Sequence, residues 1–108
     1  MPSWKAVVVA GIKRLARESR IVITEKAKVE LLALRASLPS ILDLPELDEE
    51  DIREVLLDLK QAQLVQRLTS KRTGELLYVF HPEFYGETIY LKLAVRDDCV
   101  VISFHEQQ

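Results

Sequence analysis

The chain has 108 residues, 48% hydrophobic and 30% charged, a composition expected of one compact domain with one core over residues 1–108. No apolar run reaches the length of a membrane span, and the short run at Ala6–Ala10 lacks the features of a signal peptide, so we expect a cytoplasmic protein without a membrane partner. The single cysteine, Cys99, argues against an internal disulfide, and with only two histidines we expect no metal site and no cofactor.

The formal net charge of −2 is unevenly spread. The segment Asp43–Asp58 holds eight acidic residues and one basic residue, which makes it −7 and leaves +5 on the rest of the chain. A locally basic surface can attract phosphate groups even when the whole protein is slightly acidic. The acidic segment has two interpretations, a solvated helix face or a docking site for a basic partner.

The first helix is predicted over about Ser3–Glu18, because apolar residues recur at helical spacing behind a serine that can cap the N-terminus. The residues expected on its buried stripe are Trp4, Val7, Val8, Gly11, Ile12 and Leu15. The following segment, Arg20–Thr24, is interpreted as a connector whose Ile21 and Ile23 lie against the core.

Thr24 can cap a second helix that runs to about Leu38, and Asp48 can cap a third. Asp51 lies three residues after Asp48 and completes a box-like arrangement at the N-terminus of the third helix. An irregular loop, Ser37–Leu47, separates the two helices. The residues expected on the buried faces are Ala27, Leu31, Leu34 and Leu38 in the second helix, and Ile52, Val55, Leu56 and Leu59 in the third.

After the third helix the period changes from helical to alternating, which predicts strands. The first strand is expected at Leu64–Thr69, a turn at Lys71–Gly74, the second strand at Glu75–His81 and a loop at Pro82–Gly86. The closing hairpin, Glu87–His105, supplies the third and fourth strands. Three helices followed by four strands predict an α+β fold, with the helices packed on one face of an antiparallel four-stranded meander.

The closing hairpin alternates strictly between apolar and polar positions. The face expected to be apolar holds Ile89, Leu91, Leu93, Val95, Val100, Ile102 and Phe104, and the opposite face holds Thr88, Tyr90, Lys92, Val101, Ser103 and His105. That second face offers a phenol, a fixed cation and an imidazole together. It is therefore the best candidate for a functional site.

The register of the hairpin decides which of these side chains are neighbours. A two-residue loop, or a four-residue loop at Arg96–Cys99, pairs Tyr90 with His105 and Lys92 with Ser103. The same register makes apolar pairs of Val95 with Val100, Leu93 with Ile102 and Leu91 with Phe104. A three-residue loop would mix the two faces, so the buried face selects the first register. Directly opposed residues have Cβ atoms about 4.5–5.5 Å apart, and we expect Tyr90 and His105 to be neighbours.

The hairpin also carries a family pattern, Gly86-x-x-x-Tyr-Leu-Lys-Leu-x-Val-x-x-Asp-x-Val-Val-Ile-Ser-Phe-His-Glu106. It resembles the C-terminal hairpin of the MqsR family of type II toxins, and the upstream Val79-Phe80-His81-Pro82 is similar to that family's Val-Tyr-basic-Pro segment. The resemblance is close over residues 76–106 and loose over the rest of the chain. It implies a RelE-like fold, a sequence-selective endoribonuclease that cleaves mRNA, and a cognate antitoxin that neutralises it.

The resemblance also implies site residues. The family's active-site tyrosine matches Tyr90, one of its lysines matches His105, and its glutamine falls on Leu77. A further family lysine falls near Val65–Arg67, where Arg67 is the nearest cation.

Metal-independent RNA cleavage requires a base, an acid and fixed positive charge at the phosphate. His105 or His81 can act as acid or base near neutral pH, and Tyr90 can orient the phosphate or stack on a base. The cations and polar groups expected to bind substrate are Lys92, Arg67, Lys71, Arg72 and Ser103. The face occupied by His81 stays open at this point. So do two other functions, a non-catalytic family member that binds a partner protein and a plain RNA-binding module.

Overall fold

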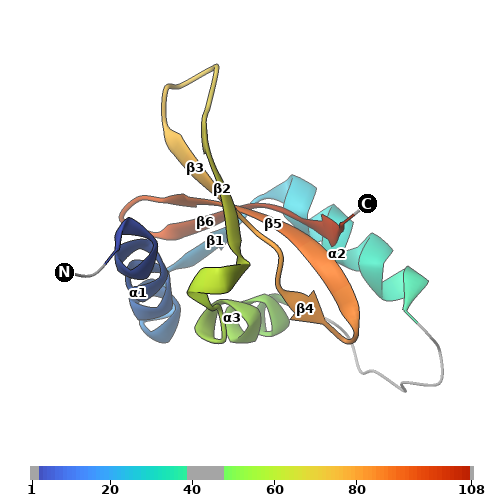
Figure 1. The fold of residues 1–108 in the computed structure, drawn as a ribbon. Coiled ribbons are helices and arrows are strands. Elements are labelled where there is room, and N and C mark those ends of the chain that lie inside the picture. The colour runs from blue at the N-terminus through green and yellow to red at the C-terminus, as the bar shows by residue number, and fades with distance from the viewer. Residues whose placement is uncertain (1–2, 39–47, 108) are drawn as a thin grey trace.

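A computed structural model of the chain describes residues 3–38 and 48–107. Most of the predicted loop Ser37–Leu47 lies outside these residues. The helices are α1 (Trp4–Arg17), α2 (Glu25–Ser37) and α3 (Glu49–Leu57), with a 3₁₀ turn η2 (Gln61–Gln63). The strands are β1 (Ile21–Ile23), β2 (Leu64–Thr69), β3 (Leu76–Phe80), β4 (Glu83–Phe84), β5 (Glu87–Val95) and β6 (Cys99–Glu106). Figure 1 shows their arrangement.

The predicted helix starts are confirmed, because each is fixed by a local side chain. The hydroxyl of Ser3 accepts from the N–H of Ala6, and that of Thr24 accepts from the N–H of Ala27. Asp48 and Asp51 form a reciprocal capping box at the start of α3. Local chemistry of this kind depends on residues three positions apart, so it can be found without the fold.

The capping box of α3 can be tested on its own. Replacing Asp48 by alanine removes the acceptor for the Glu50 N–H and breaks the box. We expect the free energy of unfolding to fall by about 1 kcal/mol, whereas asparagine at the same position should cost little because it caps equally well. Chemical denaturation of both variants measures the difference. Equal losses in the two variants would contradict a capping role.

The predicted stripe of α1 is partly wrong. Ile12 and Leu15 are buried as expected, but Trp4 is 42% exposed and Val7 is 59% exposed. The buried face is rotated toward Val9 and Ala16, since α1 packs against both α3 and β6. The Trp4 ring instead lies under the guanidinium of Arg67, whose Cζ is 4.4 Å from the ring centroid.

The α+β class and the three helices of the described chain are confirmed, but the four-stranded antiparallel meander is wrong. The described residues form a six-stranded sheet in which the order β1-β6-β5-β3-β2 is joined by β4 pairing with β5. The extra strands are short. β1 lies in the predicted connector Arg20–Thr24 and pairs with β6 in parallel, and β4 lies in the predicted loop Pro82–Gly86.

The closing hairpin combines the expected register with a three-residue loop. Tyr90 opposes His105, Leu91 opposes Phe104 and Lys92 opposes Ser103, as predicted. Closer to the turn, the pairs are Leu93 with Val101 and Val95 with Cys99, so the predicted pairs Leu93–Ile102 and Val95–Val100 are wrong.

The cause is a β-bulge at Ile102, the residue of β6 that has no opposing partner. It turns Val101 and Cys99 into the core and Val100 to the other face. The unpaired Ile102 therefore compensates for the three-residue loop. The buried face stays apolar although the hairpin lacks the two- or four-residue loop that the sequence predicts.

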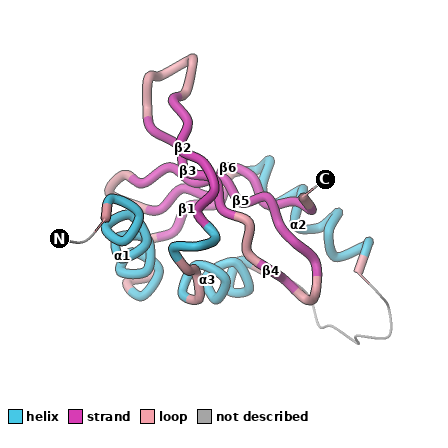
Figure 2. Tube along the Cα trace, viewed as in Figure 1, coloured by secondary structure: helices cyan, strands magenta, loops and turns pink. Residues whose placement is uncertain are grey.

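One hydrophobic cluster holds buried residues from all three helices and from one face of the sheet. On the strands it contains Leu64, Phe80, Phe84, Ile89, Leu91, Leu93, Cys99, Val101 and Phe104. Ile21 and Ile23 pack against it, as predicted, although they do so from a strand. In Figures 1 and 2, α1 and α3 lie on one side of the sheet while the β2–β3 hairpin projects away from the body.

An ion pair joins that hairpin, at the turn end of its strands, to the turn between β5 and β6. Arg96 donates two hydrogen bonds of 2.6 Å to the carboxylate of Glu75. These bonds hold the pKa of Glu75 below its usual range.

Among the described residues, no helix combines the length and apolar content that crossing a membrane would require.

Candidate functional site

Three aromatic side chains form a row across the face of the sheet that lies opposite the helical core. Tyr90 of β5 stacks on His105 of β6, with ring centroids 4.9 Å apart and planes 11° apart. On its other side Tyr90 meets His81, whose ring centroid is 6.2 Å away. The predicted neighbourhood of Tyr90 and His105 is confirmed, and the open question of which face His81 occupies is answered in favour of the same face.

Local structure explains the place of His81. It directly follows β3, and its N–H donates to the carbonyl oxygen of Gln63 at 2.8 Å. β3 pairs with β5 so that Phe80 opposes Leu91, which carries His81 to a position beside Tyr90. Neighbouring strands lie about 4.8 Å apart, so the two histidines flank Tyr90 roughly 10 Å from each other.

Lys92 is the cation of the candidate site and lies in the next row of paired residues toward the β5–β6 turn. Lys92 opposes Ser103 on β6 and Val79 on β3. The side chain of Lys92 is half-buried and makes no hydrogen bond or ion pair with any other described residue. A lysine held on this face without a carboxylate partner is free to bind an anion.

Ser103 was predicted to be a substrate-binding residue on an open surface, but it is only 1% exposed. Its hydroxyl oxygen accepts a hydrogen bond of 2.6 Å from the Lys26 ammonium of α2. In this structure the hydroxyl is therefore engaged with α2 and is not available to a phosphate.

Helix α2 supplies one wall of the site. Its Glu30 carboxylate accepts from the Phe104 N–H at 3.1 Å and lies 3.8 Å from Nε2 of His105. A pocket of about 710 Å³ opens between this helix and the aromatic pair. It is lined by Glu30, Ala33, Leu34, Ser37, Tyr90, His105, Glu106 and Gln107. Pockets of several hundred cubic ångströms accommodate small ligands or single nucleotides.

The other predicted cations, Arg67, Lys71 and Arg72, do not lie in this row of the sheet. Arg67 opposes Tyr78, a residue of the core face, and stacks on Trp4 of α1. Lys71 and Arg72 lie exposed in the turn of the projecting β2–β3 hairpin. Of the predicted site residues, the structure thus gathers Tyr90, His105, His81 and Lys92 on one face, with the buried Ser103 opposite Lys92.

A sequence profile of the family described as "Motility quorum-sensing regulator, toxin of MqsA" matches residues 9–106, nearly the whole chain. The chain belongs to the MqsR toxin family. A search of curated proteins gives no match. Membership makes the protein a toxin of a toxin–antitoxin system and implies an antitoxin partner.

The sheet register shows which further side chains of this MqsR-family member lie near the candidate site. Leu77, where the resemblance places the family's glutamine, lies on the same face as Tyr90, in the row of Ala94 and Leu68. Gln66 of β2 lies in the row of Lys92, because a bulge at Val65 shifts the register there. The amide nearest to Lys92 in this register therefore comes from β2 and not from β3.

Sequence reasoning missed Lys26, Glu30 and Gln66. Lys26 and Glu30 stand four residues apart, a spacing that indicates an ion pair on a helix, and they form one at 3.5 Å. Nothing in that spacing reveals that the helix runs beside β6. The face of Gln66 is equally hidden, since it depends on a bulge.

No group of three or more His, Cys, Asp or Glu residues within 3–38 and 48–107 is arranged to hold a metal ion. Cys99 is buried in the core, and burial raises the pKa of its thiol to about 12. It is therefore a thiol, not a thiolate, near neutral pH and is suited neither to nucleophilic attack nor to metal binding.

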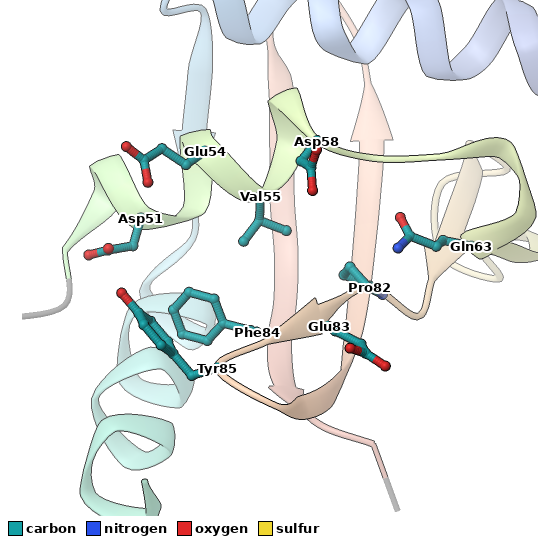
Figure 3. Close-up of a pocket in the computed structure, with 9 residues that line it drawn as sticks. All are labelled: Asp51, Glu54, Val55, Asp58, Gln63, Pro82, Glu83, Phe84 and Tyr85. Atoms are coloured by element: carbon teal, nitrogen blue, oxygen red, sulfur yellow. The ribbon is translucent and has the colours of Figure 1, made fainter. Parts of the chain in front are cut away.

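A second, smaller pocket of about 210 Å³ lies between α3 and β4. Figure 3 shows Val55 pointing from α3 toward Phe84 and Pro82, with acidic side chains around them. The residues that line it are Asp51, Glu54, Val55, Asp58, Gln63, Pro82, Glu83, Phe84 and Tyr85. Three of its acids, Asp51, Glu54 and Asp58, belong to the segment Asp43–Asp58, for which docking of a basic partner is one interpretation, and that interpretation stays a prediction.

Proposed function

We propose that this MqsR-family toxin is a metal-independent endoribonuclease that cleaves mRNA in the cytoplasm and is neutralised by its cognate antitoxin. The RelE-like fold and the single domain implied by the sequence are part of this proposal. The observation that carries it is the row of His81, Tyr90 and His105 beside Lys92. Two imidazoles, a phenol and a cation on one face make up the set of groups that the reaction requires.

The chemistry needs one proton removed and one supplied. One histidine takes the proton of the 2′-OH, whose oxygen attacks the adjacent phosphorus. The bond from phosphorus to the 5′-oxygen breaks, and the other histidine gives its proton to that oxygen. The products are a 2′,3′-cyclic phosphate and a free 5′-OH, so protons and electrons balance without a metal. The two histidines lie roughly 10 Å apart in one row, on either side of Tyr90, so a phosphate bound at the Tyr90 phenol would lie between them.

Lys92 and Tyr90 would stabilise the reacting phosphate. An ammonium without a carboxylate partner favours the extra negative charge that the phosphate gains in the transition state. The phenol of Tyr90, which makes no hydrogen bond with another described residue, can donate to a phosphate oxygen, and its ring can stack on a base of single-stranded RNA. The pocket beside α2 gives such a nucleotide a place to bind.

The requirement for a 2′-hydroxyl provides the test. We expect the purified toxin to cut a single-stranded RNA in the presence of EDTA and to release a fragment ending in a 2′,3′-cyclic phosphate. A matched oligonucleotide with one 2′-deoxy residue at the cut position should not be cut there, because the attacking oxygen is missing. Gel analysis and mass spectrometry of the fragments measure both results. Cleavage of the deoxy oligonucleotide at the same bond would refute 2′-OH attack.

A non-catalytic toxin that acts by binding a protein is the second candidate. Leu77 at the family's glutamine position favours it, since an aliphatic side chain cannot donate or accept a hydrogen bond. Expression of the toxin with the neighbouring gene product, followed by purification, tests the partner directly. Stable co-purification combined with no cleavage of any RNA by the isolated toxin would favour this candidate over the enzyme.

A further inference from the structure

The C-terminal part of strand β6, beyond Val101, has no β1 residue paired with it. β1 pairs with β6 only as far as Val101, and the chain then turns into α2 at Thr24. Thr24 continues the contact for one step, since its N–H donates to the oxygen of Val101 and its hydroxyl donates to the oxygen of Ile102. Beyond that point the N–H groups of β6 need another partner.

Glu30 of α2 takes the place of the missing strand. Its Oε1 accepts from the N–H of Phe104 at 3.1 Å. Its side chain is only 20% exposed, so this carboxylate is held in a partly desolvated position. The contact fixes the backbone between the buried Phe104 and the neighbouring His105.

The second oxygen of the same carboxylate faces the imidazole. Oε2 of Glu30 lies 3.8 Å from Nε2 of His105, while Nδ1 of His105 lies 2.9 Å from the carbonyl oxygen of Glu106. A carbonyl and a carboxylate can only accept hydrogen bonds. Both ring nitrogens of His105 therefore face acceptors: Nδ1 is within hydrogen-bond distance of the carbonyl, and a proton on Nε2 would place the ring in an ion pair with Glu30.

We propose that Glu30 is a positioning residue that holds His105 as the proton donor of the reaction. This inference rests on the proposed ribonuclease function and goes beyond it, because it assigns the acid and the base. His105, beside the carboxylate, gives its proton to the 5′-oxygen that leaves. His81, which meets Tyr90 on the far side and has no carboxylate within ion-pair distance among the described residues, takes the proton of the 2′-OH. Exchange with water afterwards returns each ring to its starting form.

Two titratable side chains contact the His105 ring, Glu30 of α2 at 3.8 Å and Tyr90 of β5 in the stack. Two more lie nearby, Lys26 of α2, which pairs with Glu30, and Glu106 of β6, which lines the same pocket. Lys26 lies 3.5 Å from Glu30 and opposes its effect on the ring. Removing the two charges of α2 should therefore act on His105 in opposite directions.

Nuclear magnetic resonance of histidine-labelled protein tests the assignment without relying on activity, because the chain has only two histidines. We expect the His105 ring signals to titrate at lower pH in Glu30→Gln and at higher pH in Lys26→Met, while the His81 signals stay in place. Glu25→Gln is the matched control, since Glu25 is on the same helix, 90% exposed, and pairs only with Lys28 among the described residues. Unchanged His105 titration in both test variants would overturn the proposal.

Kinetic measurements on Glu30→Gln separate a positioning role of Glu30 from a simple loss of stability. Glu30→Gln should lower kcat roughly 10- to 100-fold with little change in KM, the cost of a misplaced acid. The alkaline limb of its pH profile, which reports loss of the acid's proton, should move to lower pH while the acidic limb stays. A change confined to the acidic limb would reverse the assignment. If the wild-type toxin cuts no RNA, the proposed function fails, and the resonance titration still decides whether Glu30 acts on His105.

Discussion

The variant His105→Ala is expected to cut RNA roughly 10²–10⁴ times more slowly than the wild-type toxin, the range by which a general acid or base accelerates a reaction. The imidazole is stacked on Tyr90 and is 42% exposed, so its removal leaves no buried cavity and should leave the fold intact. The loss should appear in kcat more than in KM, because a proton donor acts mainly in the transition state.

Cleavage of a short fluorescent RNA, measured at several substrate concentrations, gives both constants. Arg14→Ala is the control, since this exposed cation lies on α1, across the sheet from Tyr90, and pairs only with Glu18 among the described residues. Circular dichroism of both variants checks that they fold. Wild-type rates in His105→Ala would show that His105 takes no part in the chemistry, whatever the function of the rest of the face.

The His105→Ala variant also tests whether RNA cleavage causes the toxicity. Induced expression of the wild type should stop growth, and His105→Ala should relieve the arrest in proportion to its lost cleavage. Toxicity that persists in a variant unable to cut RNA would point to the protein-binding candidate. The two readouts together therefore separate a wrong site from a wrong function.

Much of the fold follows from interactions that are local in sequence. The starts of α1, α2 and α3 are set by Ser3, Thr24 and the Asp48–Asp51 box, each within four residues of its partner. β2 is found at its predicted residues because its period of two begins and ends at clear turn signals. By contrast, β1 has only three residues and acquires its identity by pairing with β6, almost 80 positions later in the chain.

Two bulges account for most of what the sequence could not reveal about faces. Strict alternation assigns every second residue to one face, and a single unpaired residue reverses that assignment for the rest of the strand. The bulge at Ile102 turns Val101 into the core, and the bulge at Val65 turns Arg67 toward Trp4. Bulges arise from how two strands fit together, so neither can be found from the pattern of one strand.

The candidate site likewise contains one contact that the sequence predicts and one that it does not. The predicted pair Tyr90–His105 is correct because the bulge at Ile102 compensates for the three-residue loop and restores the expected register beyond it. The contact between Glu30 and His105 could not be predicted, since it depends on how the turn at Thr24 directs α2 along the edge of β6. A helix that replaces a strand neighbour thus contributes to the site a carboxylate that no motif indicates.

The variant Phe104→Ala is expected to destabilise the protein more than any other change considered. Phe104 is fully buried, and its ring meets the edge of the Phe84 ring at a centroid distance of 5.4 Å. Truncating a buried phenylalanine costs about 3–5 kcal/mol, from lost transfer free energy and from the cavity left behind. Domains of this size have only about 5–15 kcal/mol in total, so the variant should unfold at a much lower denaturant concentration.

The position of Phe104 makes this loss informative about the site as well as the core. Its side chain anchors β6 from below, while its N–H is held by Glu30 and its neighbours Ser103 and His105 point to the opposite face. A cavity beneath β6 should therefore loosen the stack of His105 on Tyr90 before the protein unfolds globally. Leu32→Ala is the control, because Leu32 is 60% exposed on α2 and its truncation should change the free energy of unfolding by less than about 0.5 kcal/mol. Similar denaturation midpoints for the two variants would mean that the core does not close over Phe104, and the rigid backbone from which Glu30 positions His105 would then have no support.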